Sequence, residues 1–404
     1  MQKQRENGEV IDVRTKKLGR VGPKPKEWPD ALLQSVPLRL RTTERSYAAA
    51  LGISHVTLYR LIKQGKLRVH SSNNHPALSA DHKIARMNWV LSHIIPGTPT
   101  TNPRFVDMDK VIHIDEKWFY LNPETRKFYL CPLEEDPYRC QQSKRFKVKG
   151  MFMGLIGRVL QDEQGRIIHD GKYGIFPFVY EQMAKKSSKN RQAGTMELKA
   201  HQHVTKDIIR DMLLNKVIPA ILEKWPRQLG RNVYIQWDNA RPHKIPTDPE
   251  FVAAATQRGL NIQMIYQPAQ SPDLNVLDLG LFNSIQSLQY HTFPTNLSEL
   301  IKEVENAYTE FDPIVNRNSW LTLQMVMLKI LQHKGGNNFK TPHMAKERLE
   351  NVGILPRNVP VDKHILEEAI HYLSKRFRPS DRPNDTNAEQ EAGNEEGRNE
   401  VDAD

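Results

Sequence analysis

Three stretches decide the fold: VIHIDEKWF (residues 111–119), VYIQWDNARPH (233–243) and SPDLNVLDLGLF (271–282). Asp115 and Asp238 each close a short apolar run of the kind that forms a buried strand. Asp278 lies in a helical pattern, on the same face as Leu281, Phe282 and Ile285. A carboxylate on such a face loses several kcal/mol of hydration unless it is paired, neutralised or bound to a cation.

These three carboxylates together indicate a chemistry. Brought to one place they repel one another, and a divalent cation relieves that repulsion. Hard carboxylate oxygens suit Mg²⁺, and two bound cations are a common engine of phosphodiester chemistry. The sequence therefore predicts a metal-dependent enzyme that acts on nucleic acid, with Asp115, Asp238 and Asp278 as its metal ligands.

Composition limits the class of protein. A chain of 404 residues predicts two or three domains, and 38% hydrophobic residues with a mean hydropathy of -0.62 are typical of a soluble protein. No apolar run approaches the roughly 18 residues that span a bilayer, and MQKQRENGEV lacks the apolar segment of a secretory signal. Two cysteines are too few for a disulfide framework. We expect an intracellular protein without a membrane partner.

Charge is distributed unevenly along the chain. Residues 1–70 hold 15 Lys and Arg against 6 Asp and Glu, whereas residues 381–404 hold nine acids and two arginines. A basic N-terminal region predicts a polyanionic partner. Residues 14–26, RTKKLGRVGPKPK, indicate an arm along a phosphate backbone, a nuclear localisation signal or a plain linker. We expect a nuclear protein whose arm contacts DNA through Arg14, Lys16, Lys17 and Arg20.

Residues 42–64, TTERSYAAALGISHVTLYRLIKQ, predict a helix-turn-helix. Thr43 and Ser54 are candidate N-caps of its two helices, and Gly52 permits the turn between them. The second helix is expected to be buried through Val56, Leu58, Leu61 and Ile62. Its other face is expected to meet the major groove of DNA through His55, Tyr59, Arg60 and Lys63.

From Lys110 the pattern changes to alternating strands and helices. The expected strands are VIHID, KFYLCP, KVKGMFMGLIGRV, VYIQWD and NIQMIYQ, whereas residues 161–203 lack clear periodicity and contain a basic loop. Helices are expected from Thr205, around Asp278, at 297–310 and at 319–332. This order predicts a ribonuclease H-like α/β catalytic domain with a mixed five-stranded sheet, preceded by an all-α helix-turn-helix DNA-binding domain.

The sequence predicts six segments along the chain. They are a basic flexible arm (1–41), the helix-turn-helix domain (42–75), a helical linker (76–108), the catalytic domain (109–318), a C-terminal helical region (319–375) and a disordered acidic tail (376–404).

The ordered set of motifs resembles that of mariner-like DNA transposases. It comprises HIDEKWF, WDNARPH and QPAQSPDLNVLDLGLF together with RTTERSYAAALGIS, GTMELK, VIPAILEKWP, SIQSLQ, LTLQMVML, GGNNFK and PHM. The 39 residues between Asp238 and Asp278 resemble the group found in plants and oomycetes. The resemblance runs from about Val10 to Pro356.

The resemblance implies cut-and-paste DNA transposition. Its catalytic triad falls on Asp115, Asp238 and Asp278, with two Mg²⁺ (or Mn²⁺) ions assisting phosphodiester hydrolysis and strand transfer. The implied partners are double-stranded DNA with terminal inverted repeats, a TA target site and a second copy of the chain in a homodimer. Glu116, Asn239 and His243 flank the acids and are candidates to support them, or to form ordinary structural hydrogen bonds.

Two features depart from the family pattern. Only the second of the usual two helix-turn-helix units is visible, and Trp237 precedes the second aspartate where a polar residue is more usual. These departures leave open a catalytically silent or host-recruited DNA-binding protein. A nuclease for RNA–DNA hybrids shares the fold, but a helix-turn-helix suits the major groove of B-form duplex rather than A-form.

Overall fold

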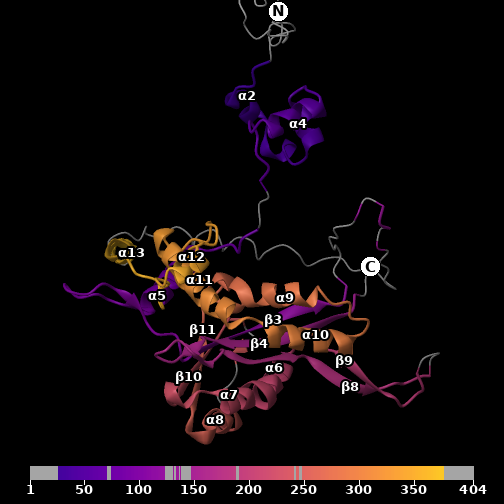
Figure 1. Cartoon of the computed structure of the whole chain (residues 1–404), viewed down its shortest axis with the longest axis vertical. Coiled ribbons are helices and arrows are strands. Elements are labelled where there is room, and N and C mark those ends of the chain that lie inside the picture. The colour runs from indigo at the N-terminus through magenta and orange to yellow at the C-terminus, as the bar shows by residue number, and fades with distance from the viewer. Residues whose placement is uncertain are drawn as a thin grey trace, which may run out of the picture. The chain divides into compact units, whose positions relative to one another are not determined.

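The computed structural model describes residues 26–70, 74–122, 131, 133–135, 137, 147–187, 191–240, 243–244 and 248–376. The chain divides into two compact units, Met1–Asn74 and His75–Asp404, and Figure 1 labels most of their larger elements. In the described part of the chain, no helix combines the length and apolar character that crossing a bilayer requires.

The first unit is a small helical domain. Its helices are α2 (Asp30–Ser35), α3 (Glu44–Ala50) and α4 (His55–Lys63). As predicted, Thr43 caps α3 by accepting from the backbone N–H of Ser46, and Ser54 caps α4 by accepting from Thr57. The predicted helix-turn-helix, α3 and α4, is confirmed.

Two expectations for this unit were wrong. Helix α2 lies inside the segment expected to be a flexible arm, where Leu33 and Val36 are buried and the hydroxyl of Tyr47 donates to the carbonyl of Leu33. A six-residue helix without a side-chain cap leaves little periodic signal. Val56 is 55% exposed, because it lies about 200° around α4 from Leu58, which faces the core.

The second unit is built on the predicted mixed five-stranded sheet. The strand order is β11 (Asn261–Tyr266), β10 (Asn232–Trp237), β3 (Val111–Tyr120), β4 (Lys149–Gly157) and β7 (Lys172–Pro177). β10 is parallel to both β11 and β3, whereas β4 is antiparallel to β3 and to β7. The carboxyl ends of β3, β10 and β11 therefore point the same way, which places the segments that follow them at one edge of the sheet.

One strand of this sheet comes from an unexpected part of the chain. The expected strand KFYLCP falls almost entirely outside the described residues, and β7 belongs to the stretch 161–203 that lacked periodicity. Tyr173, Gly174 and Ile175 are buried in succession, so β7 has no polar face to produce alternation. The same stretch forms the hairpin β8 (Val179–Met183) and β9 (Met196–Ala200).

β3 is also longer than expected. Asp115 was expected to end the strand, but β3 continues to Tyr120 and pairs with β4 throughout. Asp115 lies opposite Gly154, where an added Cβ would come within 2.8 Å of Leu277. This glycine lets the turn that carries Asp278 approach the sheet closely.

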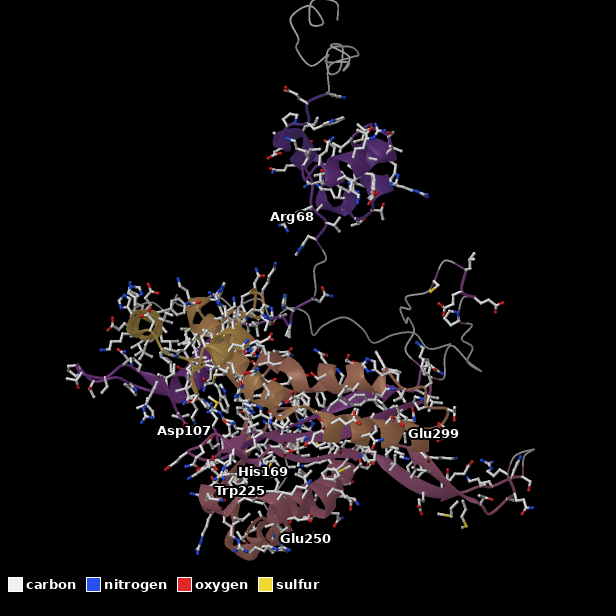
Figure 2. All side chains as sticks on the ribbon, viewed as in Figure 1. Arg68, Asp107, His169, Trp225, Glu250 and Glu299 are labelled. Carbon is white, nitrogen blue, oxygen red and sulfur yellow. The ribbon has the colours of Figure 1, made fainter. Side chains whose placement is uncertain are left out.

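Helices cover both faces of the sheet (Figure 1). One face packs against α6 (Lys206–Met212), α7 (Ile218–Lys224) and α8 (Pro249–Ala255), a layer marked by Trp225 and Glu250 in Figure 2. The other packs against α9 (Phe282–Gln289), α10 (Leu297–Glu310) and α11 (Pro313–Gln332), with Glu299 marking α10 in Figure 2.

The remaining elements are short or join the second layer. Helices α5 (Ala80–Ser92), α12 (Lys346–Asn351) and α13 (Lys363–Arg376) lie around α11. Two small pairs of strands are β1 (Ile94–Ile95) with β2 (Arg104–Phe105) and β5 (Leu160–Gln161) with β6 (Ile167–His169). Short helical turns lie at Leu38–Leu40, Arg227–Leu229, Gln257–Gly259 and Pro272–Leu274, and π-helical turns at Leu213–Val217 and Leu277–Leu281.

The expected boundary between residues 318 and 319 falls inside α11. That helix begins at Pro313, and Trp320, Leu323 and Met327 are buried in the same core as α9 and α10. The linker helix α5 contributes Met87 and Val90 to this core. The three segments expected as a linker, a catalytic domain and a C-terminal helical region thus belong to one compact unit.

Candidate active site

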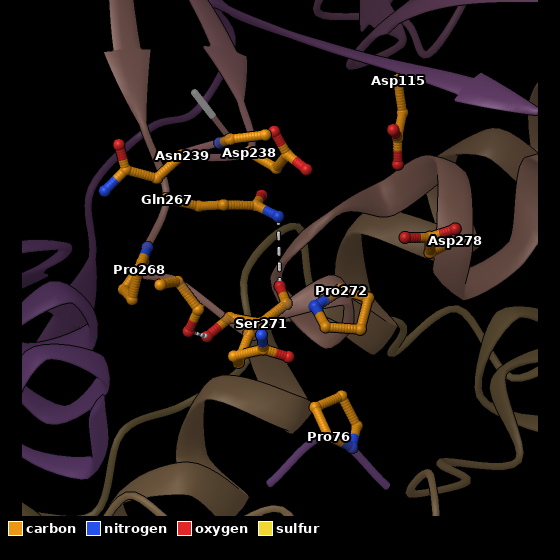
Figure 3. A pocket seen from close by; sticks show the side chains of 12 residues that line it. Pro76, Asp115, Asp238, Asn239, Gln267, Pro268, Ser271, Pro272 and Asp278 are labelled. Carbon is orange, nitrogen blue, oxygen red and sulfur yellow. Dashed lines mark hydrogen bonds between the residues drawn. The ribbon is translucent and has the colours of Figure 1, made fainter. Parts of the chain in front are cut away.

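The three aspartates line one pocket of about 350 Å³. Asp115 extends from the middle of β3, Asp238 directly follows β10, and Asp278 lies in the π-helical turn before α9. Figure 3 shows the three carboxyl groups pointing toward a common space. Single π-helical turns recur at functional sites, because they displace a side chain from the regular helical surface.

Asp278 differs in one respect from the expectation. It is exposed, although its neighbours Leu277 and Leu281 are buried. The turn directs its carboxylate into the pocket rather than into the apolar layer, so its loss of hydration is smaller than the helical pattern implied.

Asp115 and Asp278 form a mutually repelling pair. Burial raises the pKa of Asp115 well above its usual value, and the charges of Asp278, Glu116 and Asp238 raise it further. The surrounding protein atoms also raise the pKa of Asp278, although this residue reaches solvent and shares a hydrogen bond with Asp115. The pair therefore retains a proton more readily than ordinary surface aspartates.

Asn275 fixes the orientation of Asp115. Its side-chain amide donates to Oδ2 of Asp115 over 3.3 Å and to the carbonyl of Ile114 over 3.1 Å. Its side-chain oxygen accepts from the backbone N–H of Leu277 over 3.1 Å. Asn275 is fully buried and thereby ties β3 to the turn that carries Asp278. Sequence reasoning missed this role, since nothing local distinguishes it from a turn asparagine.

Asp238 is held by a buried histidine, His243, one of the residues that flank the acids in sequence. Nδ1 of His243 hydrogen-bonds to Oδ1 of Asp238, and its Nε2 lies 3.3 Å from Oε1 of Glu116. The imidazole stacks on Trp237 with 3.9 Å between ring centroids and 12° between planes. Nε1 of Trp237 donates to Oε2 of Glu116 over 3.4 Å. The unusual tryptophan therefore forms a buried platform for His243.

This arrangement separates the charge states of the acids. Burial opposes the charged form of His243, but its bonds to Asp238 and Glu116 outweigh this and raise its pKa to about 9. Burial likewise opposes the charged form of Asp238, but hydrogen bonds from His243 and Ala240 outweigh it and lower the pKa of Asp238. At neutral pH a charged His243 thus keeps Asp238 ionised.

Replacing Glu116 with glutamine is expected to lower the pKa of His243 from its value of about 9, because one of its two acceptors loses its charge. An NMR titration of the imidazole measures this change. Glu299→Gln, which removes the same charge on α10, is the matched control. An unaltered titration in Glu116→Gln would show that Asp238 alone stabilises the protonated ring.

Lys117 is a second residue that sequence reasoning missed. It follows Asp115 by two positions on β3, so both side chains lie on one face of the sheet. Its ammonium lies 5.5 Å from the ring centroid of Phe282, and its charge opposes the rise in the pKa of Asp278. The sequence does contain a signal for Lys117, because residues two positions apart on a strand, such as Asp115 and Lys117, lie on the same face.

A buried ion pair fixes the turn between β11 and Asp278. The guanidinium of Arg86 on α5 donates from Nη1 and Nη2 to the two carboxylate oxygens of Asp273, each over 2.6 Å. Its Nε donates to the carbonyl of Gly335 over 2.9 Å. Arg86 is fully buried, so three segments distant in sequence meet at one charged group.

The other expected site residues divide into three groups. Asn239 is exposed and lines the pocket. His55, Tyr59, Arg60 and Lys63 are exposed on α4 as expected. Nε2 of His55 lies 2.8 Å from Oε2 of Glu44. Arg14, Lys16, Lys17 and Arg20 lie outside the described residues.

The carboxylate oxygens of the three aspartates are ligands that suit a divalent cation, but they do not form a complete set of ligands by themselves. In the described part of the chain, no group of three or more His, Cys, Asp or Glu side chains is arranged to hold a metal ion. The three carboxylates nevertheless line one pocket, and two have raised pKa values that a cation would reverse. Asp115, Asp238 and Asp278 are the residues that would hold it.

The sheet, its two helical layers and the preceding helix-turn-helix define a ribonuclease H-like α/β fold coupled to an all-α domain. No protein-family model matches the sequence, and no curated protein matches it. Among solved structures, the fold is similar to that of Mos1 mariner transposase.

Two Mos1 structures illustrate this similarity. A pre-cleavage Mos1 transpososome has a TM-score of 0.52 and 18% identity, covering 83% of this chain and 86% of that one. The mariner Mos1 paired-end complex with Mg has a TM-score of 0.52 and 19% identity, with the same coverage. At this identity the likeness establishes the fold.

Proposed function

We propose that this chain is a mariner-like DNA transposase that performs cut-and-paste transposition. The convergence of Asp115, Asp238 and Asp278 on one pocket of a ribonuclease H-like fold carries the proposal. The similar Mos1 structures include a pre-cleavage transpososome and paired-end complexes with Mn and with Mg, which supports DNA and a divalent cation as ligands here. The chain would bind terminal inverted repeats, insert at TA and act in the nucleus as a homodimer.

The chain's own residues prepare this reaction. His243 keeps Asp238 ionised, Asn275 orients Asp115, and Lys117 adds positive charge beside Asp278. Bound divalent cations supply Lewis acidity to the attacking and leaving oxygens of the phosphodiester. The exposed face of α4 offers Arg60 and Lys63 to the DNA duplex.

The direct test uses the full chain and duplex DNA carrying the inverted repeats that flank its coding sequence. With Mg²⁺ or Mn²⁺ we expect cleavage at the repeat ends and joining to a TA-containing target, and with EDTA neither product. Preferential cleavage of an RNA–DNA hybrid would replace the proposal with a hybrid nuclease.

A second candidate is a catalytically silent protein that binds the same DNA. The sequence motivates it, since only one of the two helix-turn-helix units usual in the mariner-like family is visible. Sequence-specific binding of repeat ends without any product in Mn²⁺ would establish this alternative.

A further inference from the structure

A basic groove lies away from the three aspartates, at the end of the sheet where β4 begins. It has a volume of about 670 Å³ and is bounded by the start of β4, by the β8–β9 hairpin and by Leu297 at the start of α10. We call it the lysine groove, because Lys147, Lys149 and Lys199 line it. No aspartate or glutamate is among the described residues that line it.

Two of the lysines, Lys149 and Lys199, are held by the surrounding structure. The ammonium of Lys149 lies 3.8 Å from the ring centroid of Trp118, and that of Lys199 donates to Oε1 of Gln182 over 2.9 Å. Glu197 lies 3.6 Å from Lys199 but is also paired with Arg191, so it neutralises Lys199 only in part. Lys149 and Lys199 therefore hold positive charge in defined positions on the wall of the groove.

An aromatic side chain completes the wall. Tyr180 is 40% exposed and lies opposite Lys199 in the register of the hairpin. Its ring contacts that of His201, with 4.7 Å between centroids. Lysine ammonium groups and tyrosine hydroxyls are among the side-chain groups that contact the phosphate oxygens of duplex DNA.

The position of the groove relates it to the pocket. In the β3–β4 ladder Asp115 pairs with Gly154, and five residues further along Tyr120 pairs with Lys149. Five strand residues span about 17 Å. This length corresponds to roughly five steps of B-form DNA at about 3.4 Å each along one strand.

We propose that the lysine groove binds the phosphate backbone of the DNA whose reacting phosphate occupies the pocket, about five nucleotide steps away. This inference rests on the proposed function. Because groove and pocket share one pair of strands, their separation is fixed by the backbone ladder. The lysines would contact any sequence, since phosphate contacts position DNA without reading its bases.

The test measures the salt dependence of DNA binding by the full chain in EDTA. The variant Lys147→Ala/Lys149→Ala/Lys199→Ala is expected to reduce the slope of log affinity against log salt by about 2 to 3, at about 0.9 per lost phosphate contact. A 40-base-pair duplex serves as the probe. Lys147→Arg/Lys149→Arg/Lys199→Arg is expected to keep the wild-type slope.

The matched control is Lys206→Ala/Lys216→Ala/Lys302→Ala, which removes the same charge from exposed lysines outside the groove. Equal slopes in the two alanine variants would overturn the proposal. A polyglutamate peptide tests the alternative of an acidic protein partner, and a groove variant that loses affinity only for this peptide would also overturn the proposal. A groove variant that does not fold leaves the decision to Tyr180→Ala/Lys199→Ala, whose slope should fall by about 1.

The two proposals fail separately. Binding in EDTA is independent of catalysis, so a reduced slope with no cleavage by the wild-type chain would reject the transposase and keep the groove. Cleavage by the wild-type chain with equal slopes in the alanine variants would do the reverse.

Discussion

Asp278→Asn is expected to reduce DNA cleavage strongly while making the metal-free protein more stable. The pKa of Asp278 is raised in the folded protein, so its ionised form at neutral pH opposes folding. Asparagine removes the repulsion and can donate permanently to Asp115. Cleavage should fall at least about a hundredfold, because metal-assisted stabilisation of the transition state is worth several kcal/mol and about 1.4 kcal/mol is tenfold.

Thermal unfolding with and without Mg²⁺ measures the stability part of this prediction. In EDTA the variant should unfold at a higher temperature than the wild type, and Mg²⁺ should raise the midpoint of the wild type more than that of the variant. Asp273→Asn would be a poor control because of its buried partner, so Glu303→Gln on α10 serves instead. A variant with lowered stability in EDTA, or with wild-type cleavage, would contradict the assignment of Asp278.

Asp273→Ala is expected to cost about 3 kcal/mol or more in the free energy of unfolding. The side chain of Arg86 is 0% exposed and that of Asp273 24% exposed, so the substitution leaves a buried guanidinium without its carboxylate. The turn that carries Asn275 and Asp278 should loosen with it, lowering cleavage as well. Denaturant unfolding of the full chain measures the first effect.

Two comparisons separate the burial of this ion pair from its charge. Glu368→Ala removes an acid from the exposed pair with His364 and should cost less than about 1 kcal/mol. The double variant Arg86→Met/Asp273→Leu should recover most of the stability, because apolar side chains of similar size avoid the cost of burying charge. A small effect of Asp273→Ala would show that water reaches Arg86 when Asp273 is absent.

The sequence predicts those parts of the fold whose signals are local. β10, β11 and α10 have clear apolar patterns between cap or turn residues, and the structure places them where the patterns indicate. β7 could not be predicted from its pattern because both of its faces are buried. Helix α2 could not because its six residues make fewer than two turns and have no side-chain cap. The full length of β3 could not be predicted either. Glu116 and Lys117 interrupt its apolar pattern, because both are polar residues of the candidate site.

The candidate site divides in the same way. Three acids at the ends of predicted elements suffice to predict a shared pocket. Asn275 and Asp115 are 160 residues apart, and Arg86 and Asp273 are 187 apart, so only the folded chain brings these partners together. The contacts of His243 with Asp238 and Glu116 are predictable only in part. The residues flank the acids in sequence, but their hydrogen bonds depend on the register of β3 and β10.

The burial of α5 in the second unit determines which N-terminal truncations should still fold. A fragment that begins at Asp109 would discard Met87 and Val90, both 0% exposed, and would leave an apolar trench along α11. A fragment that begins at His75 keeps this helix and matches the boundary between the two units. Truncation at residue 75 should therefore yield soluble protein, whereas truncation at 109 should yield aggregates.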